Sequence, residues 1–149
     1  MPDTYSVEVR SRVMARVKGR DTTPELVLRR ALYARGARGW RCHRKDVPGK
    51  PDLCFGPTRV AVFVDGAFWH GHPKKYWPGR SGPYWDAKIE RNRARDRRIN
   101  AELQAAGWRV IRLWDFEVEK DPIGAAERVI REVSQRSIDL KVASRVTEK

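Results

Sequence analysis

Apolar residues along this 149-residue chain fall into blocks with two different spacings. Over residues 21–36 they recur every three or four positions, which predicts an amphipathic helix. Thr22 or Thr23 can cap the start of this helix, and Gly36 ends it. Three short apolar runs separated by Pro and Gly follow, a pattern that is typical of strands. These runs are residues 40–44, 51–55 and 59–64.

The second half of the chain repeats this alternation. A long helical pattern runs from Trp85 to Ala106. An apolar run at residues 108–114 indicates a fourth strand, and residues 121–135 indicate another helix. The order is helix, three strands, helix, strand, helix, so the sequence predicts an α/β fold with helices flanking a central mixed β-sheet. The run at 59–64 is the most apolar, and we expect it in the middle of the sheet.

The length of the chain suits one compact domain, which we place at residues 1–137. Residues 1–20 are basic, and we interpret them as a helical N-terminal arm of that domain. Residues 138–149 show no packing pattern and are expected to form a loose tail. Cys42 and Cys54 are the only cysteines and do not form a CxxC pair, so we expect reduced thiols in the core.

Charge narrows the class of partner. The chain has 32 Lys and Arg against 19 Asp and Glu, a net charge of +13, which suits a polyanion better than a neutral metabolite. Nucleic acid is the first expectation, and an anionic membrane surface is the alternative. The membrane is disfavoured because no apolar run approaches the roughly 18 residues that a spanning helix needs. The N-terminus has no apolar signal core, so we expect an intracellular, soluble protein in the cytoplasm.

The long helix contains an anomaly. Its inward stripe consists of Trp85, Ile89, Ile99, Leu103 and Ala106. Asn92 and Asp96 interrupt this stripe and therefore face the sheet or its edge, and Lys88 lies one turn before Asn92. Two interpretations stay open: a surface charge ladder with Asp96 held by a nearby arginine, or a polar site beside the sheet.

Two acids stand where strands meet loops, Asp52 before one apolar run and Asp65 after the next. Either can be a turn residue or a helix cap. Carboxylates in these places also suit Mg²⁺, which prefers oxygen ligands and accepts phosphate oxygens in the rest of its shell. His70 can take a proton from an attacking water near neutral pH. His72 can be its partner, a metal ligand or a solvated side chain.

Three further residues have two interpretations each. Phe68 and Trp69 are either a plug in the core or a wedge that enters a duplex between base pairs. Such a wedge would favour mispaired sites, because they unstack more easily. Glu25 is the return half of a capping box if Thr22 is the helix cap. If Thr23 is the cap, the Glu25 carboxylate is free to approach a metal-bound water.

Five stretches of the chain form a specific combination: RSRVMARVKGRDTTPE, PGKPDLCF, VFVDGAFWHGH, YWDAKIERNRARDRR and LQAAGWRVIRLWD. Taken together, they resemble the very-short-patch mismatch repair endonucleases, which are DNA-nicking relatives of type II restriction enzymes. The stretches cover residues 10–115 in the order found in that family, and FWHGH after VDG is the most specific part.

The resemblance implies a restriction-endonuclease-like core that hydrolyses one DNA strand with one or two Mg²⁺ ions. The implied cut lies on the 5′ side of the thymine in a T:G mismatch, which deamination of 5-methylcytosine produces. Asp52 is implied as the principal metal ligand, with the backbone carbonyl of Val64 as another. His70 is similar to a residue that positions or deprotonates water, and Glu25 to an acid near the metals. Asp65 is added to the predicted catalytic residues because it lies at the end of the strand that carries Val64.

The resemblance also implies the DNA contacts. Phe68 and Trp69 match the aromatic wedge, and Met14 on the arm matches its counterpart from the other groove. Lys88 and Asn92 match DNA-contacting positions. The implied partner is a duplex with a T:G mismatch, other mismatch-repair proteins are candidate partners, and we expect a monomer.

One departure from the family concerns a structural zinc, which three cysteines and one histidine commonly hold. The corresponding positions here are Ala67, His72, Lys74 and Phe116. One remaining ligand cannot make a tetrahedral site, so we expect no structural zinc. Our hypothesis is that Ala67 and Phe116 fill that volume with apolar contacts.

Two rival functions fit the same sequence. The first is a restriction-type endonuclease of the same fold that cuts paired or modified DNA. The second is a non-catalytic basic DNA-binding protein, in which Asp52 would be dispensable.

Overall fold

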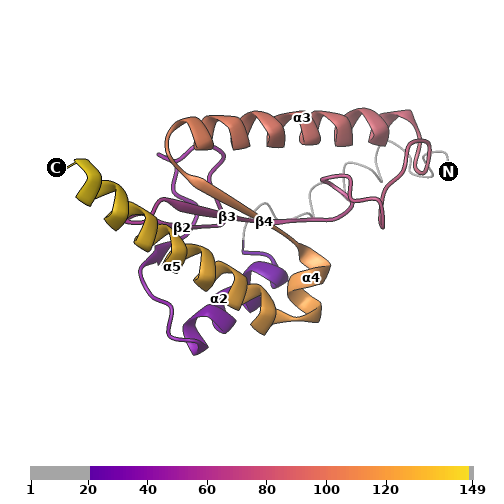
Figure 1. Ribbon diagram of the computed structural model, residues 1–149. Coiled ribbons are helices and arrows are strands. Elements are labelled where there is room, and N and C mark those ends of the chain that lie inside the picture. The colour runs from indigo at the N-terminus through magenta and orange to yellow at the C-terminus, as the bar shows by residue number, and fades with distance from the viewer. Residues whose placement is uncertain (1–20, 148–149) are drawn as a thin grey trace.

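The computed structural model describes residues 21–147, in which helices cover both faces of a four-stranded sheet (Figure 1). The elements are α2 (Thr23–Ala34), β1 (Trp40–Arg41), β2 (Leu53–Phe55), β3 (Val60–Asp65), α3 (Pro83–Ala105), β4 (Arg109–Trp114), α4 (Asp115–Lys120) and α5 (Pro122–Thr147). The predicted α/β arrangement is therefore confirmed. The arm at residues 1–20, with Met14, lies outside the described residues.

The sheet is mixed, as predicted, with the strand order β1-β2-β3-β4. Strand β2 is antiparallel to both β1 and β3, whereas β3 and β4 are parallel. The apolar run expected at the centre is β3, which pairs with β4 along its whole length. Its pairing with β2 runs from Val60, opposite Phe55, only as far as Val62, opposite Leu53. The last three residues of β3 thus have a strand on one side and a free edge on the other.

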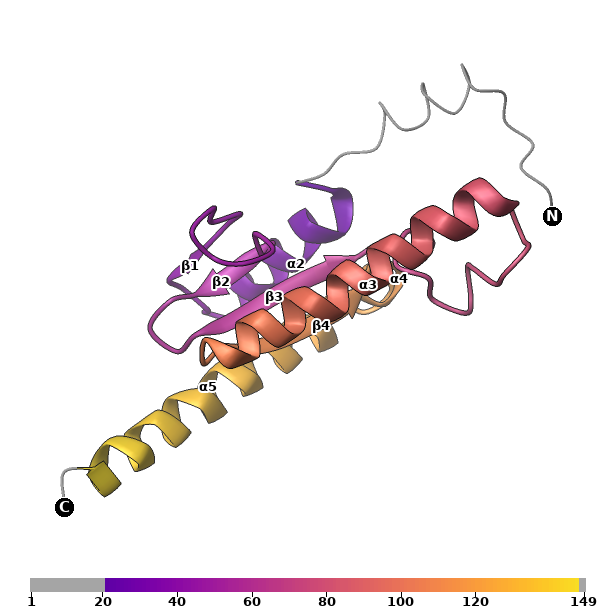
Figure 2. The ribbon, with the colours of Figure 1, turned by 90° about the horizontal axis from the view of Figure 1, so that it is seen from above.

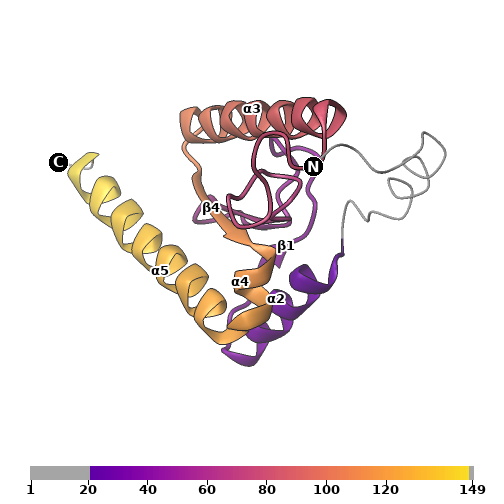
Figure 3. The same ribbon diagram turned by 90° about the vertical axis from the view of Figure 1, so that its right-hand side faces the viewer.

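Each face of the sheet has its own core, because side chains alternate between the faces of a strand. Val60 and Val62 of β3 pack with residues of α2, α4 and α5. Ala61 and Phe63, one position on from each, pack with Leu103 of α3 on the other face. Helix α3 runs along β3 and β4 on its face (Figure 2), and α2, α4 and α5 lie together on the opposite face (Figure 3).

The loop that joins β3 to α3 lies close against that helix. Gly71 adopts a φ of +73°, and an added Cβ atom there would lie 2.8 Å from Cδ of Arg93. Glycine is therefore required at this position for both conformation and space. Farther along the loop, the hydroxyl of Tyr76 donates to Asp86 at 3.0 Å. These contacts fix the segment that carries His70 beside α3.

Four local expectations are corrected. Helix α4 was not predicted, because six residues are too few to show a helical period. Ala106 is the exposed C-terminal cap of α3 and not part of its buried stripe, and Cys42 is exposed and not in the core. The helix expected to end near residue 135 continues to Thr147.

The last three turns of α5 project beyond the sheet (Figure 1). Ile138, Val142 and Val146 are 54%, 54% and 67% exposed there, so these apolar side chains are not buried, although Asp139 beside them forms an ion pair with Arg109. Backbone hydrogen bonds within the helix extend it through this exposed end, which the spacing of apolar residues does not predict. Among residues 21–147 no helix combines the length and the apolar character that a bilayer crossing requires.

Candidate active site

A pocket of about 940 Å³ lies along the free edge of β3. Its walls come from the start of α2, the loop before β2, the end of β3, the loop after it and one side of α3. The pocket collects most of the residues predicted from the sequence. These are Glu25, Asp52, Val64, Asp65, Trp69, His70, Lys88 and Asn92.

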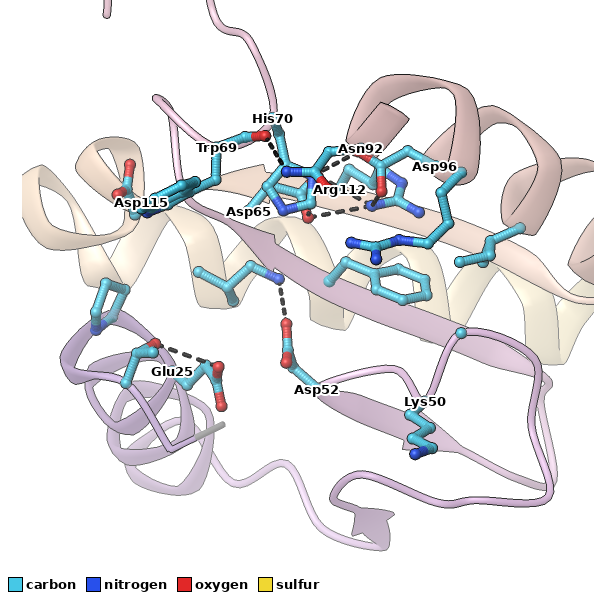
Figure 4. A pocket seen from close by; sticks show the side chains of 18 of the residues that line it. Glu25, Lys50, Asp52, Asp65, Trp69, His70, Asn92, Asp96, Arg112 and Asp115 are labelled. Carbon is cyan, nitrogen blue, oxygen red and sulfur yellow. Dashed lines mark hydrogen bonds and ion pairs between the residues drawn. The ribbon is translucent and has the colours of Figure 1, made fainter. Parts of the chain in front are cut away.

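Asp52 lies where β2 would have to continue to pair with the end of β3 (Figure 4). Its Oδ2 atom accepts a hydrogen bond from the backbone N–H of Val64 at 2.6 Å. Burial raises the pKa of Asp52 to about 7, and the nearby carboxylate of Glu25 adds to the rise, although the Val64 N–H opposes it. The buried charge of Asp52 is therefore costly until a cation compensates it.

The backbone of Val64 offers a second oxygen at this place. In an extended strand the N–H and C=O groups of one residue point to the same side. The N–H of Val64 points to Asp52, so its carbonyl points past the end of β2 as well. An aspartate and a backbone carbonyl are oxygen ligands of the kind that Mg²⁺ prefers. The residues present therefore fit the predicted divalent cation.

Glu25 combines features of both interpretations made from the sequence. Thr22 is the N-cap of α2, but it makes no side-chain bond to the helix backbone, so the capping box is not formed. The Glu25 carboxylate instead accepts hydrogen bonds from the backbone N–H of Asp21 at 2.8 Å and from the hydroxyl of Thr22 at 3.2 Å. The residue is buried at 4% exposure and still lines the pocket.

His43 is a neighbour of these acids that the sequence did not reveal. Its Nε2 atom lies 3.4 Å from Glu25 and 3.5 Å from Asp21, and its Nδ1 atom lies 3.9 Å from Asp52. A φ of +51° and a backbone bond to the carbonyl of Pro51 hold it there. We call these residues, Asp21, Glu25, His43 and Asp52, the Asp52 cluster. In the sequence, the one sign of a role for His43 is that it lies shortly before the Pro-Asp pair that contains Asp52.

A second group, the His70 cluster, consists of Asp65, His70, Asp96 and Arg112. The Nδ1 atom of His70 lies 2.5 Å from Oδ2 of Asp96 and 3.8 Å from Oδ1 of Asp65. Burial lowers the pKa of His70, but the bond to Asp96 and the charge of Asp65 outweigh it, so that the pKa is raised. Asp96 thus combines both interpretations made from the sequence, because it lies beside an arginine and also belongs to a polar site.

Arg112 connects the two acids of this cluster, and it was not predicted. Its Nη1 atom lies 3.1 Å from both carboxylate oxygens of Asp65 and 3.5 Å from Asp96. Burial raises the pKa of Asp65, and His70 and Arg112 act against that rise. The structure therefore places Asp65 with Arg112 and not in the Asp52 cluster. The available signal was an arginine between the apolar residues Ile111 and Leu113 of β4.

Of the predicted aromatic pair, Trp69 lines the pocket and Phe68 does not. The rings of Phe68 and Trp69 meet edge to face, with centroids 5.2 Å apart, and both also contact the buried ring of Trp85. The side chain of Asn92 donates to the backbone carbonyl of Trp69 at 2.8 Å (Figure 4). Phe68 and Trp69 are half-buried, so they support the core and also present apolar surface.

The positions that correspond to the family's zinc ligands come together here through aromatic contacts. The ring of His72 lies edge to face against Phe116, with centroids 5.1 Å apart, and its Nδ1 atom accepts a bond from the backbone of Lys74. The ammonium of Lys74 lies 4.7 Å from the centre of the Phe116 ring. Ala67 is buried, and its N–H donates to Asp115.

Buried acids beside an imidazole, in a pocket of a chain with a charge of +13, indicate a hydrolase that acts on nucleic acid. A family model described as DNA mismatch endonuclease Vsr matches residues 2–75. The chain belongs to the Vsr family and is a DNA endonuclease, which confirms the resemblance.

Three relatives illustrate the family relationship. The type II nicking enzyme V.XorIIP of Xanthomonas oryzae is 43% identical, over 89% of this chain and 97% of its own. The type II nicking enzyme V.NmeDIP of Neisseria meningitidis is 39% identical, over 90% of this chain and 92% of its own. The DNA mismatch endonuclease Vsr of Escherichia coli is 34% identical, over 77% of this chain and 74% of its own.

Proposed function

We propose that this endonuclease nicks one strand of duplex DNA on the 5′ side of the thymine in a T:G mismatch, with Mg²⁺ as its cofactor and a restriction-endonuclease-like core as its scaffold. The observation that carries the proposal is the single pocket that Asp52, His70 and Trp69 share. It joins an acid suited to a hard cation, a base and an aromatic group. The names of the relatives, a mismatch endonuclease and nicking enzymes, support the same reaction.

Asp52 and the backbone carbonyl of Val64 would hold the cation, and Glu25 would approach it from α2. When bound, Mg²⁺ polarises the phosphate and lowers the pKa of water, which is the chemistry that phosphodiester hydrolysis needs. The raised pKa of Asp52 fits this role, because a carboxylate destabilised by burial gains most from a cation.

His70 would orient the attacking water and take its proton. Because Nδ1 is bonded to Asp96, the proton on that nitrogen is held and Nε2 is left to accept. The Nε2 atom has no hydrogen-bond partner among residues 21–147. Asp96 therefore fixes the tautomer that a general base requires.

Recognition of the mismatch would come from the aromatic side of the pocket. Phe68 and Trp69 would enter the duplex at the mispaired step, opposed by Met14 from the arm. Lys88 would contact the DNA from α3, where it lines the pocket. Asn92 still has its amide oxygen available, because only its nitrogen is bonded to Trp69. The enzyme would act as a monomer on chromosomal DNA in the cytoplasm.

The test is nicking of two duplexes of identical sequence that differ only in carrying T:G or T:A. We expect a nick 5′ to the thymine in the T:G duplex alone, and only with Mg²⁺ present. Equal cutting of both duplexes would instead indicate a restriction-type enzyme. Tight binding without any cutting, in Mg²⁺ or Mn²⁺, would indicate a non-catalytic DNA-binding protein.

A further inference from the structure

The imidazole of His70 has two acids within reach, and only one of them can accept its Nδ1 proton at a time. Asp96 lies at 2.5 Å and Asp65 at 3.8 Å from the same nitrogen. Both carboxylates are largely buried, so water alone cannot solvate their charges. Something in the fold must therefore determine which acid pairs with the ring.

Arg112 is placed to do this from the middle of β4. Its Nη1 atom contacts both oxygens of Asp65 at 3.1 Å, and Asp96 lies 3.5 Å away. The Nε atom donates to Asn100 at 2.8 Å, and the guanidinium carbon lies 4.2 Å from the centre of the Phe63 ring. The Arg112 guanidinium is thus held by Asn100 at Nε, by the Phe63 ring on one face and by two acids at Nη1. It therefore has little freedom to move.

We propose that Arg112 is a positioning residue of the nuclease: it binds Asp65 through both oxygens, so that Asp96 alone accepts the Nδ1 proton of His70 and Nε2 faces the pocket. The expected effect on nicking rests on the proposed function. The expected effect on the His70 tautomer does not, because the imidazole has a preferred tautomer in the free protein as well.

A metal ion is the alternative occupant of this cluster. Ligand atoms of Asp65, His70 and Asp96 lie within 4.8 Å of one another, which by spacing alone would suit a cation. The guanidinium of Arg112 already lies against both of these acids, and a second positive charge would meet it at close range. In the His70 cluster, Arg112 thus supplies the positive charge that a metal ion would supply at Asp52.

The chain provides a matched control on the same strand. Arg109, three residues before Arg112 on β4, forms an ion pair with Asp139 of α5. It does not line the pocket. Replacing it removes an arginine and an ion pair from β4 without touching the His70 cluster.

The activity test compares Arg112→Leu, Arg112→Lys and Arg109→Leu in single-turnover nicking of the T:G duplex. We expect Arg112→Leu to slow nicking by about tenfold or more, within the range that a misplaced general base explains, with duplex affinity within about twofold. Lysine can bind Asp65 but not both acids, so Arg112→Lys should recover part of the rate. Equal losses in Arg112→Leu and Arg109→Leu would overturn the proposal, as would loss of affinity alone.

The second readout needs no substrate. In ¹⁵N-histidine-labelled protein without DNA, at a pH where the ring is neutral, the His70 resonances should show the proton on Nδ1, and His70→Ala assigns them. We expect Arg112→Leu to mix the two tautomers and Arg109→Leu to leave them unchanged. An unaltered His70 spectrum in Arg112→Leu would refute the inference even if the parental protein did not nick T:G DNA.

If Arg112→Leu does not fold, the double variant Asp65→Asn with Arg112→Leu gives the answer, because it removes both charges of the pair together. With the competing acid gone, the proposal requires His70 to keep its proton on Nδ1. A mixed tautomer in this double variant would show that Arg112 does not act through Asp65.

Discussion

The two clusters of the pocket contain the same kinds of side chain, yet they differ in which of their acids an arginine reaches. In the His70 cluster, Arg112 lies against both acids. In the Asp52 cluster, Arg29 reaches Asp21 at 2.6 Å. No lysine or arginine among residues 21–147 pairs with Asp52 itself.

This difference indicates what each cluster can do. Buried acids that an arginine neutralises within the fold can hold an imidazole in place without an added ion. Within the part of the chain that the structure describes, the nitrogen atoms that reach Asp52 are a backbone N–H and, at 3.9 Å, the imidazole of His43. A buried acid without a strong cationic partner is costly, and a divalent ion from solution can remove that cost. One cluster is thus suited to positioning and the other to binding metal.

The largest effect is expected at Asp52. Asp52→Asn should lower nicking by about a thousandfold or more, since loss of the metal removes several kcal/mol of stabilisation. Binding of the duplex should be largely retained, as measured by fluorescence anisotropy. Asp46→Asn is the matched control, because this acid lies on the same loop and pairs with Arg44 at the surface. Parental cutting rates in Asp52→Asn would refute the assignment of the metal site.

Loss of the imidazole should come next. His70→Ala should slow nicking by about 10²- to 10⁴-fold at saturating Mg²⁺, the usual range for a general base. Asp96→Asn should lose less, because it disturbs only the orientation of the ring. His72→Ala, two residues away on the same loop, is the control, and single-turnover rates measure all three. If His72→Ala is as slow as His70→Ala, the base has been misassigned.

A smaller effect should follow from pH. The pKa of Asp52 is raised to about 7, so this carboxyl is protonated below that value and ionised above it. Mg²⁺ competes with the proton, so the apparent Mg²⁺ affinity should fall by up to about tenfold for each pH unit below 7 and level off above 8. Mg²⁺ titrations of the nicking rate at pH 6, 7 and 8 measure this. A constant affinity would mean that Asp52 does not titrate in this range or does not bind the ion.

The smallest effect concerns discrimination. Trp69→Ala should reduce the preference for T:G over T:A by about tenfold, within the 1–3 kcal/mol of stacking on one base. Affinity for either duplex should change less than the preference does. Trp77→Ala is the control, because this ring is 54% exposed and lies outside the pocket lining. Unchanged discrimination in Trp69→Ala would show that the wedge is a core residue only.

Part of the candidate site could be predicted from local sequence patterns, and part of it depends on contacts between residues far apart in the chain. Asp52 and His70 could be recognised because each stands in a short motif beside an apolar run. The role of Arg112 could not, since its acid Asp65 is 47 residues away in the chain and reaches it only through the parallel pairing of β3 with β4. His43 depends in the same way on how the loop before β2 folds back. Sequence patterns reveal which face a residue occupies, but not its partner on that face.

The most direct test of the account is where the divalent ion binds. Mn²⁺, detected by electron paramagnetic resonance, can be titrated into the enzyme bound to a T:G duplex with a non-hydrolysable linkage at the nick. We predict that Asp52→Asn loses the bound ion and that Asp65→Asn retains it. Retention in Asp52→Asn together with loss in Asp65→Asn would place the metal in the His70 cluster and contradict the account.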